Sequence, residues 1–129
     1  MGGIVRFEDL VAWKEARELN RSLAEIYGKP NLKKEFYICG QVKRSAISVM
    51  ANIAEGFGRY GLKDSRNFYI IARGSLTETQ SHLYAIKDLK YLSEEEFEGL
   101  FQKTILVSKL INGLISNAGK LLKRNEVNL

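Results

Sequence analysis

The chain has few of the residues that build disulfides, metal sites and sharp backbone breaks. Among its 129 residues are one cysteine, one histidine and one proline. Cys39 therefore has no partner for an internal disulfide, and together with His82 it supplies too few ligands for a zinc site. Pro30 is the single proline, and valine, isoleucine and threonine do not alternate with polar residues at a period of two. Both features argue against a β-sheet and favour helices.

Signals for export and membrane insertion are also missing. The first nine residues lack a basic segment followed by an apolar stretch, so they do not resemble a secretory signal. No apolar run approaches the roughly 20 residues that span a bilayer. A free thiol in such a chain suits a reducing compartment. These features predict a soluble, cytoplasmic protein.

The sequence does contain enough apolar residues for one helical core. Its length and its hydrophobic fraction of 45% predict a single domain over residues 1–129. Apolar residues recur at steps of three and four, which predicts helices over residues 8–27, 34–55, 64–90 and 94–122. The short connections favour an all-α, antiparallel up-down-up-down four-helix bundle.

Two of the helix boundaries carry specific signals. Gly28 followed by Pro30 predicts a helix stop, with the glycine in a left-handed conformation. Ser93 and Glu96 have the spacing of a capping box, in which each side chain bonds the other residue's backbone N–H. The last helix is therefore expected to begin directly after Ser93.

The same periodicity predicts which side chains face inward. They include Phe68 and Leu89 in the third segment, and Ile105 and Ser108 in the fourth. Gly40 lies inside the second helix, where glycine costs up to about 1 kcal/mol relative to alanine. Close approach of a neighbouring helix is the expected reason for it.

Positive charge is concentrated in residues 29–73. This window holds nine basic and three acidic residues, a sum of +6, so the rest of a chain of net charge +5 sums to −1. The nine basic residues are Lys29, Lys33, Lys34, Lys43, Arg44, Arg59, Lys63, Arg66 and Arg73. A localised positive field suits a polyanion such as RNA, whereas the alternative is ordinary solvated lysine and arginine.

A stripe of polar residues follows the second helix at steps of three and four. It consists of Gln41, Ser45, Ser48, Asn52, Glu55 and Arg59. One interpretation is a solvated face, but short Ser and Asn are poor helix formers there. The other is a buried or inter-subunit network, in which Arg44 or Arg73 pairs with Glu55 or Glu78.

Residues 56–61 match the pattern G-x-G-x-x-G between the second and third helices. A dinucleotide site would need a strand before this pattern, and here a helix precedes it. It is therefore interpreted as a glycine turn, with one alternative: backbone N–H groups and Arg59 could hold a phosphate. Phe57 and Tyr60, beside Arg59 and Lys63, are candidate stacking platforms for unpaired bases.

Ser75, His82 and Asp88 invite comparison with a catalytic triad, which helix geometry excludes within one chain. Ser75 and His82 are seven residues apart on one helix, so they are separated by about 10.5 Å along its axis. A nucleophile and its base need about 3 Å. His82 is interpreted as a packing residue, and no catalytic residue, metal ligand or cofactor site is predicted.

Three segments resemble a known family. Residues 7–16 (FEDLVAWKEA), 41–59 (QVKRSAISVMANIAEGFGR) and 72–78 (ARGSLTE) are similar to the four-helix bundle family of 23S rRNA intervening-sequence proteins, also called S23 proteins. The resemblance covers roughly residues 7–115. Lys43 stands where the family often carries a second arginine, and lysine lacks arginine's bidentate grip on phosphate.

The resemblance implies a left-handed bundle that assembles as a ring, commonly of five subunits. Relatives are encoded within insertions in ribosomal RNA genes. The accessory protein of diversity-generating retroelements is similar in fold and is associated with RNA and a reverse transcriptase. No enzyme activity is established for the family, and the resemblance strengthens the expectation of RNA binding.

The leading hypothesis is a non-enzymatic homo-oligomer, most simply a pentamer, that binds RNA or DNA mainly through phosphates. The candidate nucleic-acid-binding residues are Lys33, Lys34, Lys43, Arg44, Phe57, Arg59, Tyr60, Lys63, Arg66 and Arg73. The candidate polar network or subunit interface comprises Gln41, Arg44, Ser48, Asn52, Glu55, Arg73 and Glu78. A second hypothesis is a homo-pentameric scaffold that recruits an acidic protein, and a third is an enzyme built between subunits.

Overall fold

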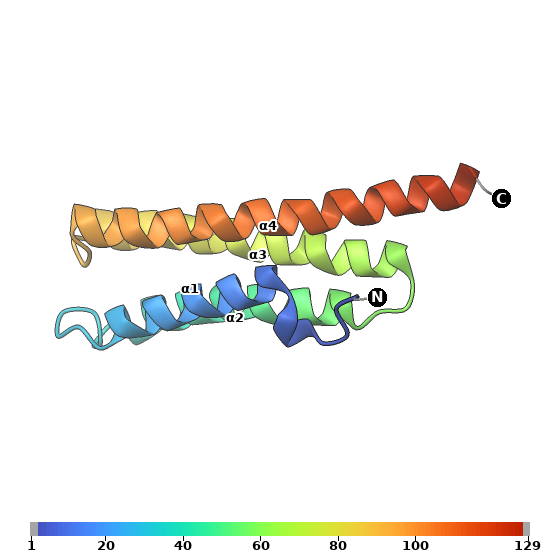
Figure 1. The fold of residues 1–129 in the computed structure, drawn as a ribbon. Helices are drawn as coiled ribbons and strands as arrows, with labels where there is room; N and C mark the ends of the chain where they lie inside the picture. The colour runs from blue at the N-terminus through green and yellow to red at the C-terminus, as the bar shows by residue number, and fades with distance from the viewer. Residues whose placement is uncertain (1–2, 128–129) are drawn as a thin grey trace.

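Four α-helices make up nearly all of the chain. The computed structural model describes residues 3–127 (Figure 1). Its elements are a short 3₁₀ helix, η1 (Phe7–Asp9), then α1 (Val11–Tyr27), α2 (Phe36–Phe57), α3 (Leu62–Asp88) and α4 (Glu94–Val127). Within residues 3–127 there is no strand, so the prediction of an all-α protein with four helices is confirmed. None of the described helices is long and apolar enough to cross a membrane.

The starts of the first two helices differ from the predicted positions by two or three residues. The helix predicted from residue 8 begins at Val11, because residues 7–9 form a separate turn and Leu10 is extended. The helix predicted from residue 34 begins at Phe36. The N–H groups of Leu32 and Glu35 donate within the preceding turns, so the α-helical bonding pattern starts only afterwards.

The left-handed residue predicted at Gly28 is instead Lys90. Gly28 has φ −87°, whereas Lys90 has φ 70°, the single positive value among residues 3–127. The N–H of Tyr91 donates to the carbonyl of Ile86 at 3.1 Å, and a second bond completes a Schellman motif. This motif ends α3 at Asp88, two residues before the predicted end.

Replacing Lys90 with glycine is expected to stabilise the fold. A side chain with a Cβ in the left-handed region costs about 1 kcal/mol, which glycine does not incur. We therefore expect Lys90→Gly to raise the free energy of unfolding by about 0.5–1 kcal/mol in urea titrations. Lys90→Ala keeps the Cβ and should leave the stability unchanged; equal gains in both variants would contradict the explanation.

The capping box at the start of α4 is confirmed. The Glu96 N–H donates to Ser93 Oγ at 3.0 Å, and the Ser93 N–H donates to Glu96 Oε1 at 2.9 Å. Glu94 and Glu95 add negative charge to the same first turn, where the helix dipole favours it. At its other end α4 runs five residues beyond the predicted limit of 122.

The buried apolar side chains of all four helices form one core. Its largest fully buried members are Leu19, Leu23, Leu32, Val42, Val49, Ile53, Leu76, Leu83, Ile86, Val107 and Ile111. In α3, Tyr69 occupies the core position expected for Phe68, which is half-buried. Leu89 is 54% exposed because it follows the last turn of α3.

In the middle of α4 the inward stripe is shifted by one residue from its predicted position. Thr104 and Val107 are buried, whereas the predicted Ile105 and Ser108 are half-buried at the side. Thr104 is tolerated in the core because its hydroxyl donates to a carbonyl of its own helix and accepts from Gln80 at 2.9 Å. The spacing of apolar residues cannot predict a buried threonine, because the hydrogen bonds that allow its burial depend on a neighbouring helix.

Gly56, not Gly40, is the glycine at which two helices approach closely. No heavy atom would lie within 4 Å of a Cβ added at Gly40. At Gly56 an added Cβ would lie 2.6 Å from the Tyr69 ring and 3.0 Å from the carbonyl oxygen of Ser65. The end of α2 therefore packs directly against the start of α3.

The side-chain contacts between α2 and α3 pair earlier residues of α2 with later residues of α3. Ser45 of α2 bonds Thr79 of α3, whereas Ser48, further along α2, bonds Ser75, which comes earlier in α3. The loop joining α1 to α2 lies at one end of the molecule, and the loop joining α2 to α3 lies at the other (Figure 1). The last turns of α4 project beyond α3 at this second end.

Candidate nucleic-acid interface

The polar stripe of α2 forms a seam with α3 inside the chain. Ser45 and Thr79 are both fully buried and their hydroxyls lie 2.8 Å apart. Ser48 and Ser75 make a similar 2.8 Å contact at a half-buried position. Asn52 donates to the backbone oxygen and the hydroxyl of Ser48. These short side chains let the two helices approach and hydrogen-bond.

Charged residues lie along the exposed rim of this seam. Arg44 pairs with Glu78 and also donates to Gln41. Glu55 pairs with Arg59 one turn along its own helix. Of the four pairings that the sequence left open, the structure therefore has Arg44 with Glu78. Arg73 bonds Asn112 of α4 instead, at 3.2 Å.

The predicted basic residues do not form one surface. Lys33 and Lys34 precede α2, whereas Lys63 and Arg66 lie in the first turns of α3. The 22 residues of α2 separate these groups by about 33 Å at 1.5 Å per residue. Lys43 lies along α2 with its ammonium 4.9 Å from the Tyr27 ring.

Some of these charges are already neutralised. Arg59 pairs with Glu55 and lies 3.6 Å from Asp64, and its guanidinium covers the Phe68 ring. Arg44 is paired as described above. An ion pair within the chain weakens the attraction for an external phosphate, so the nine basic residues of this window overstate the number of cations that are free to bind one.

A basic cluster lies where α3 begins and α4 ends, and the sequence interpretation predicted only its two members in α3. Its members, here called the basic end, are Lys63, Arg66, Lys120, Lys123 and Arg124. None of them forms a salt bridge within residues 3–127. A Cβ added at Gly119 would lie 3.5 Å from Arg66 Nε, which shows that this side chain lies against α4.

Two features of the basic end favour an anionic partner. Arg66 Nε is buried and has no hydrogen-bond acceptor among the described residues. Lys123 and Arg124 follow Lys120 by three and four residues on α4, and the three side chains are centred opposite its buried Ile111, Ile115 and Ala118. Their charges therefore project away from the core. A spacing of three and four among basic residues was the available signal in the sequence.

The predicted stacking residues differ from each other in exposure. Phe57 is half-buried and packs on the core, so its ring is not free for a base. Tyr60 is fully exposed in the loop before α3. The sequence interpretation overlooked Phe36 and Tyr37, which are 83% and 79% exposed at the start of α2.

The glycine-rich segment does not form a phosphate cradle from successive backbone groups. Gly56 is part of α2, and the N–H groups of Gly58 and Arg59 donate to carbonyls of the last turn of α2. Gly58 has φ −78°, within the ordinary helical range. This segment is a tight exit from α2 into the short connection before α3.

Ser75 and His82 keep the separation expected on one helix. The Ser75 hydroxyl is engaged with Ser48, and His82 Nε2 lies 3.4 Å from Glu78 Oε2 without the alignment of a hydrogen bond. Within residues 3–127, no three His, Cys, Asp or Glu side chains gather as metal ligands would. The chemistry available at the basic end is electrostatic attraction and hydrogen-bond donation.

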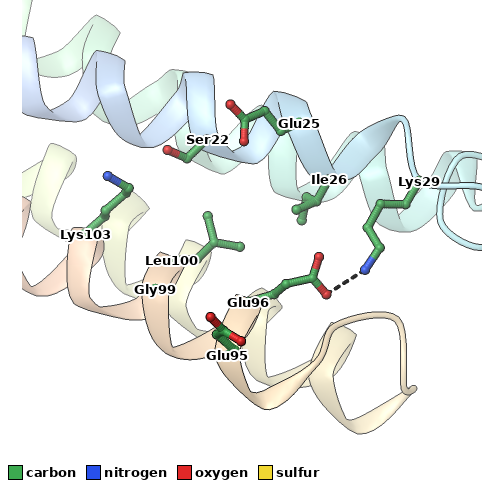
Figure 2. A pocket seen from close by; sticks show the side chains of 9 residues that line it. All are labelled: Ser22, Glu25, Ile26, Lys29, Glu95, Glu96, Gly99, Leu100 and Lys103. Carbon is green, nitrogen blue, oxygen red and sulfur yellow. Dashed lines mark hydrogen bonds and ion pairs between the residues drawn. The ribbon is translucent and has the colours of Figure 1, made fainter.

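A cavity of about 290 Å³ lies between α1 and the start of α4, at the end opposite the basic end (Figure 2). Its charged lining residues are Glu25, Lys29, Glu95, Glu96 and Lys103. Lys29 Nζ lies 2.6 Å from Glu96 Oε1 and links the turn after α1 to the first turn of α4. Because carboxylates outnumber ammonium groups here, the cavity is a poor phosphate site.

The Lys29–Glu96 contact makes stability depend on pH in acid. The hydrogen bond from Lys29, followed by that from the Ser93 N–H, holds the Glu96 pKa below its ordinary 4.5. A depressed carboxyl pKa contributes stability that is present above 4.5 and lost as the pH falls through the folded-state value. We expect Glu96→Gln to unfold more easily at pH 7, by a few tenths to about 1 kcal/mol after solvent screening.

This difference should shrink as the pH falls below 4.5, and denaturant titrations of both proteins at several pH values measure it. Glu95→Gln is the matched control, because Glu95 lies in the same helical turn but forms no ion pair among the described residues. A Glu96→Gln effect that is the same at pH 7 and in acid would contradict the assignment.

Comparison with known proteins identifies the family. The sequence model of the 23S rRNA-intervening sequence proteins matches residues 8–113. The chain belongs to this family. A crystal structure of a protein of unknown function from the S23 ribosomal protein family of Bacteroides thetaiotaomicron is similar in fold, with a TM-score of 0.76 and 26% sequence identity. The similarity covers 81% of this chain and 98% of that one. No curated protein matches the chain.

The segment that matches the 23S rRNA-intervening sequence family covers most of the bundle but not the end of α4. The match stops at residue 113. Lys120, Lys123 and Arg124 therefore lie beyond the segment that the family model describes, whereas Lys63 and Arg66 lie inside it. The basic end therefore combines residues of α3 inside the matched segment with residues of α4 beyond it.

Proposed function

We propose that this protein is a non-enzymatic, cytoplasmic homo-oligomer that binds RNA, mainly through phosphates, at the basic end. The observation that carries the proposal is the gathering of Lys63, Arg66, Lys120, Lys123 and Arg124 without acidic partners among the described residues. Unpaired cations projecting from a rigid element release counterions when they meet phosphates. The family's description as 23S rRNA-intervening sequence proteins supports RNA over DNA.

The proposed assembly is a left-handed, antiparallel up-down-up-down bundle that forms a ring of five subunits. The opposed pairings of Ser45 with Thr79 and Ser48 with Ser75 support the antiparallel arrangement. Exposed Ile47, Ile71 and Leu106 support contacts between subunits, because large apolar side chains on several helices favour burial. Sedimentation at micromolar concentration tests the assembly, and a monomer would contradict it.

The test of RNA binding uses a labelled, unstructured RNA of about 20 nucleotides, longer than the roughly 4–16 nucleotides that one single-strand-binding domain covers. We expect retention at about 50 mM salt that falls steeply as salt is added. Absence of any salt-sensitive retention would overturn the proposal. A duplex of the same length shows whether the basic end distinguishes single from double strands.

One observation favours a second function, a scaffold that binds a protein partner. A wholly apolar groove of about 310 Å³ lies on the outer face of α1 and α2. It is lined by Phe7, Trp13, Ile47, Met50, Ala51 and Ala54. Such grooves suit protein contacts rather than phosphates. Affinity capture with and without nuclease separates the functions: partners that persist after nuclease treatment favour the scaffold.

A further inference from the structure

Two adjacent aromatic side chains are almost fully exposed at the start of α2. Phe36 is 83% and Tyr37 is 79% exposed, whereas aromatic side chains usually bury roughly 150–250 Å². Lys33 and Lys34, just before them, are exposed and form no salt bridge within residues 3–127. Proteins bind single-stranded nucleic acid with this combination, because the rings stack on bases and the lysines attract phosphates.

Tyr37 lines a groove whose lining does not include Phe36. Tyr37 forms a wall of a cavity of about 210 Å³ between the first turns of α2 and the last turns of α3. The lining residues are Tyr37, Ile38, Gln41, Val42, His82 and Ala85. Sites for drug-sized ligands run to roughly 300–1,000 Å³, so this groove suits a single small planar group. Its surface is mostly apolar, as a base-stacking site requires.

The polar groups beside the groove suit the edge of a base. Gln41 Oε1 accepts from Arg44 at 3.3 Å, and the amide nitrogen of Gln41 has no partner among the described residues. A side-chain amide carries both a hydrogen-bond donor and an acceptor, and the edge of a base presents the same two kinds of group. Tyr37 and Gln41 are one turn apart on the same face of α2, so both can engage one base.

Two acidic residues lie near the groove, and one of them is neutralised by an ion pair. Glu35 accepts from the hydroxyl of Tyr91 at 2.7 Å. Glu78 pairs with Arg44. Lys33 and Lys34, four and three residues before Tyr37, outnumber Glu35, so residues 33–35 carry a net charge of +1. The groove thus combines a ring, an amide and positive charge.

We propose that the groove between Tyr37 and His82 binds one unpaired base of a single-stranded nucleic acid, stacked on Tyr37 and hydrogen-bonded by Gln41. Lys33 and Lys34 contact the adjoining phosphates. This inference rests on the proposed function for its ligand but concerns a different site. It lies at the opposite end of α2 from the basic end, about 33 Å away for 22 helical residues.

The chain offers a specific probe of this site. His82 is the only histidine, so its imidazole resonances in an NMR spectrum belong to one residue, and that residue lines the groove. Adenosine 5′-monophosphate added at millimolar concentration should shift these resonances through the ring current of a stacked base. No shift with the mononucleotide or with a short adenylate oligomer would overturn the proposal.

Variants at Tyr37 and Phe36 distinguish RNA binding in the groove from non-specific binding to exposed aromatic side chains at the start of α2. Tyr37→Ala should weaken binding of an unstructured RNA by roughly 5- to 100-fold, the range seen when a stacking aromatic becomes alanine. Tyr37→Phe keeps the ring and should restore most of the affinity. Phe36→Ala is the matched control, because Phe36 is equally exposed but does not line the groove. Equal losses for Tyr37→Ala and Phe36→Ala would contradict the proposal.

Different results are expected if the groove proposal is wrong and if the proposed function is wrong. If the groove inference alone is wrong, RNA still binds with steep salt dependence, and Tyr37→Ala binds as tightly as the parent protein. If phosphate binding at the basic end is wrong, the mononucleotide still shifts the His82 resonances. A Tyr37→Ala variant that sediments as a smaller assembly, with nucleotide binding unchanged, would show that the groove is a subunit contact and overturn the proposal.

Discussion

Replacing Lys63, Lys120 and Lys123 together with glutamine is expected to weaken binding of unstructured RNA on the order of 100-fold at low salt. The three ammonium groups lie at the basic end and have no acidic partner within residues 3–127. Each phosphate contact contributes counterion release, so three lost contacts act together. Fluorescence anisotropy of a labelled RNA measures the change, and all three side chains are exposed, so the fold should be unaffected.

The matched control replaces Lys14, Lys103 and Lys109 with glutamine. These lysines are also exposed and form no salt bridge among the described residues, and the net charge falls by the same three units, from +5 to +2. We expect an affinity within a few-fold of the parent, because long-range charge alone is screened beyond about 10 Å. Similar losses in both triple variants would mean that RNA responds to net charge and not to the basic end.

Gly56→Ala is expected to destabilise the fold by about 1–3 kcal/mol, the range for overpacking a close contact. The new methyl would lie 2.6 Å from the Tyr69 ring and 3.0 Å from a backbone oxygen of α3, which is not free to move away. The ring is itself buried, so it cannot rotate into solvent without loss of core packing. Urea denaturation followed by circular dichroism measures the loss.

Gly40→Ala supplies the comparison within the same helix. An added Cβ meets nothing within 4 Å there, so the substitution should stabilise the protein by up to about 1 kcal/mol through helix propensity. The two alanine variants are therefore expected to change stability in opposite directions. Equal effects would show that α2 and α3 do not approach closely at Gly56.

The sequence predicts the helical fold well because its signals are local. Apolar periodicity gives four helices, and Ser93 with Glu96 fixes the start of α4. The errors arise where a tertiary contact overrides a local rule. Lys90 takes a left-handed conformation that propensity assigns to glycine, and Thr104 enters the core because Gln80 satisfies its hydroxyl.

The candidate site is less predictable because charge summed along the chain ignores its arrangement in space. The window of residues 29–73 combines Lys33 and Arg66, which lie at opposite ends of α2. It also counts Arg44 as a free cation, because its partner Glu78 lies outside the window. Lys123 was missed because acidic residues at the start of the last helix cancel it in the sum. Only the fold brings the end of α4 to the start of α3, where Arg66 lies against Gly119.

The salt dependence of RNA affinity tests the central claim most directly. For an unstructured RNA, the logarithm of the association constant should fall linearly with the logarithm of salt concentration between about 50 and 200 mM. Three to five phosphate contacts at roughly 0.7 per contact predict a slope of about −2 to −3.5. The Lys63, Lys120 and Lys123 triple variant should have a shallower slope by about 2. A slope near zero for the parent protein, or no binding at the lowest salt, would contradict phosphate binding at the basic end.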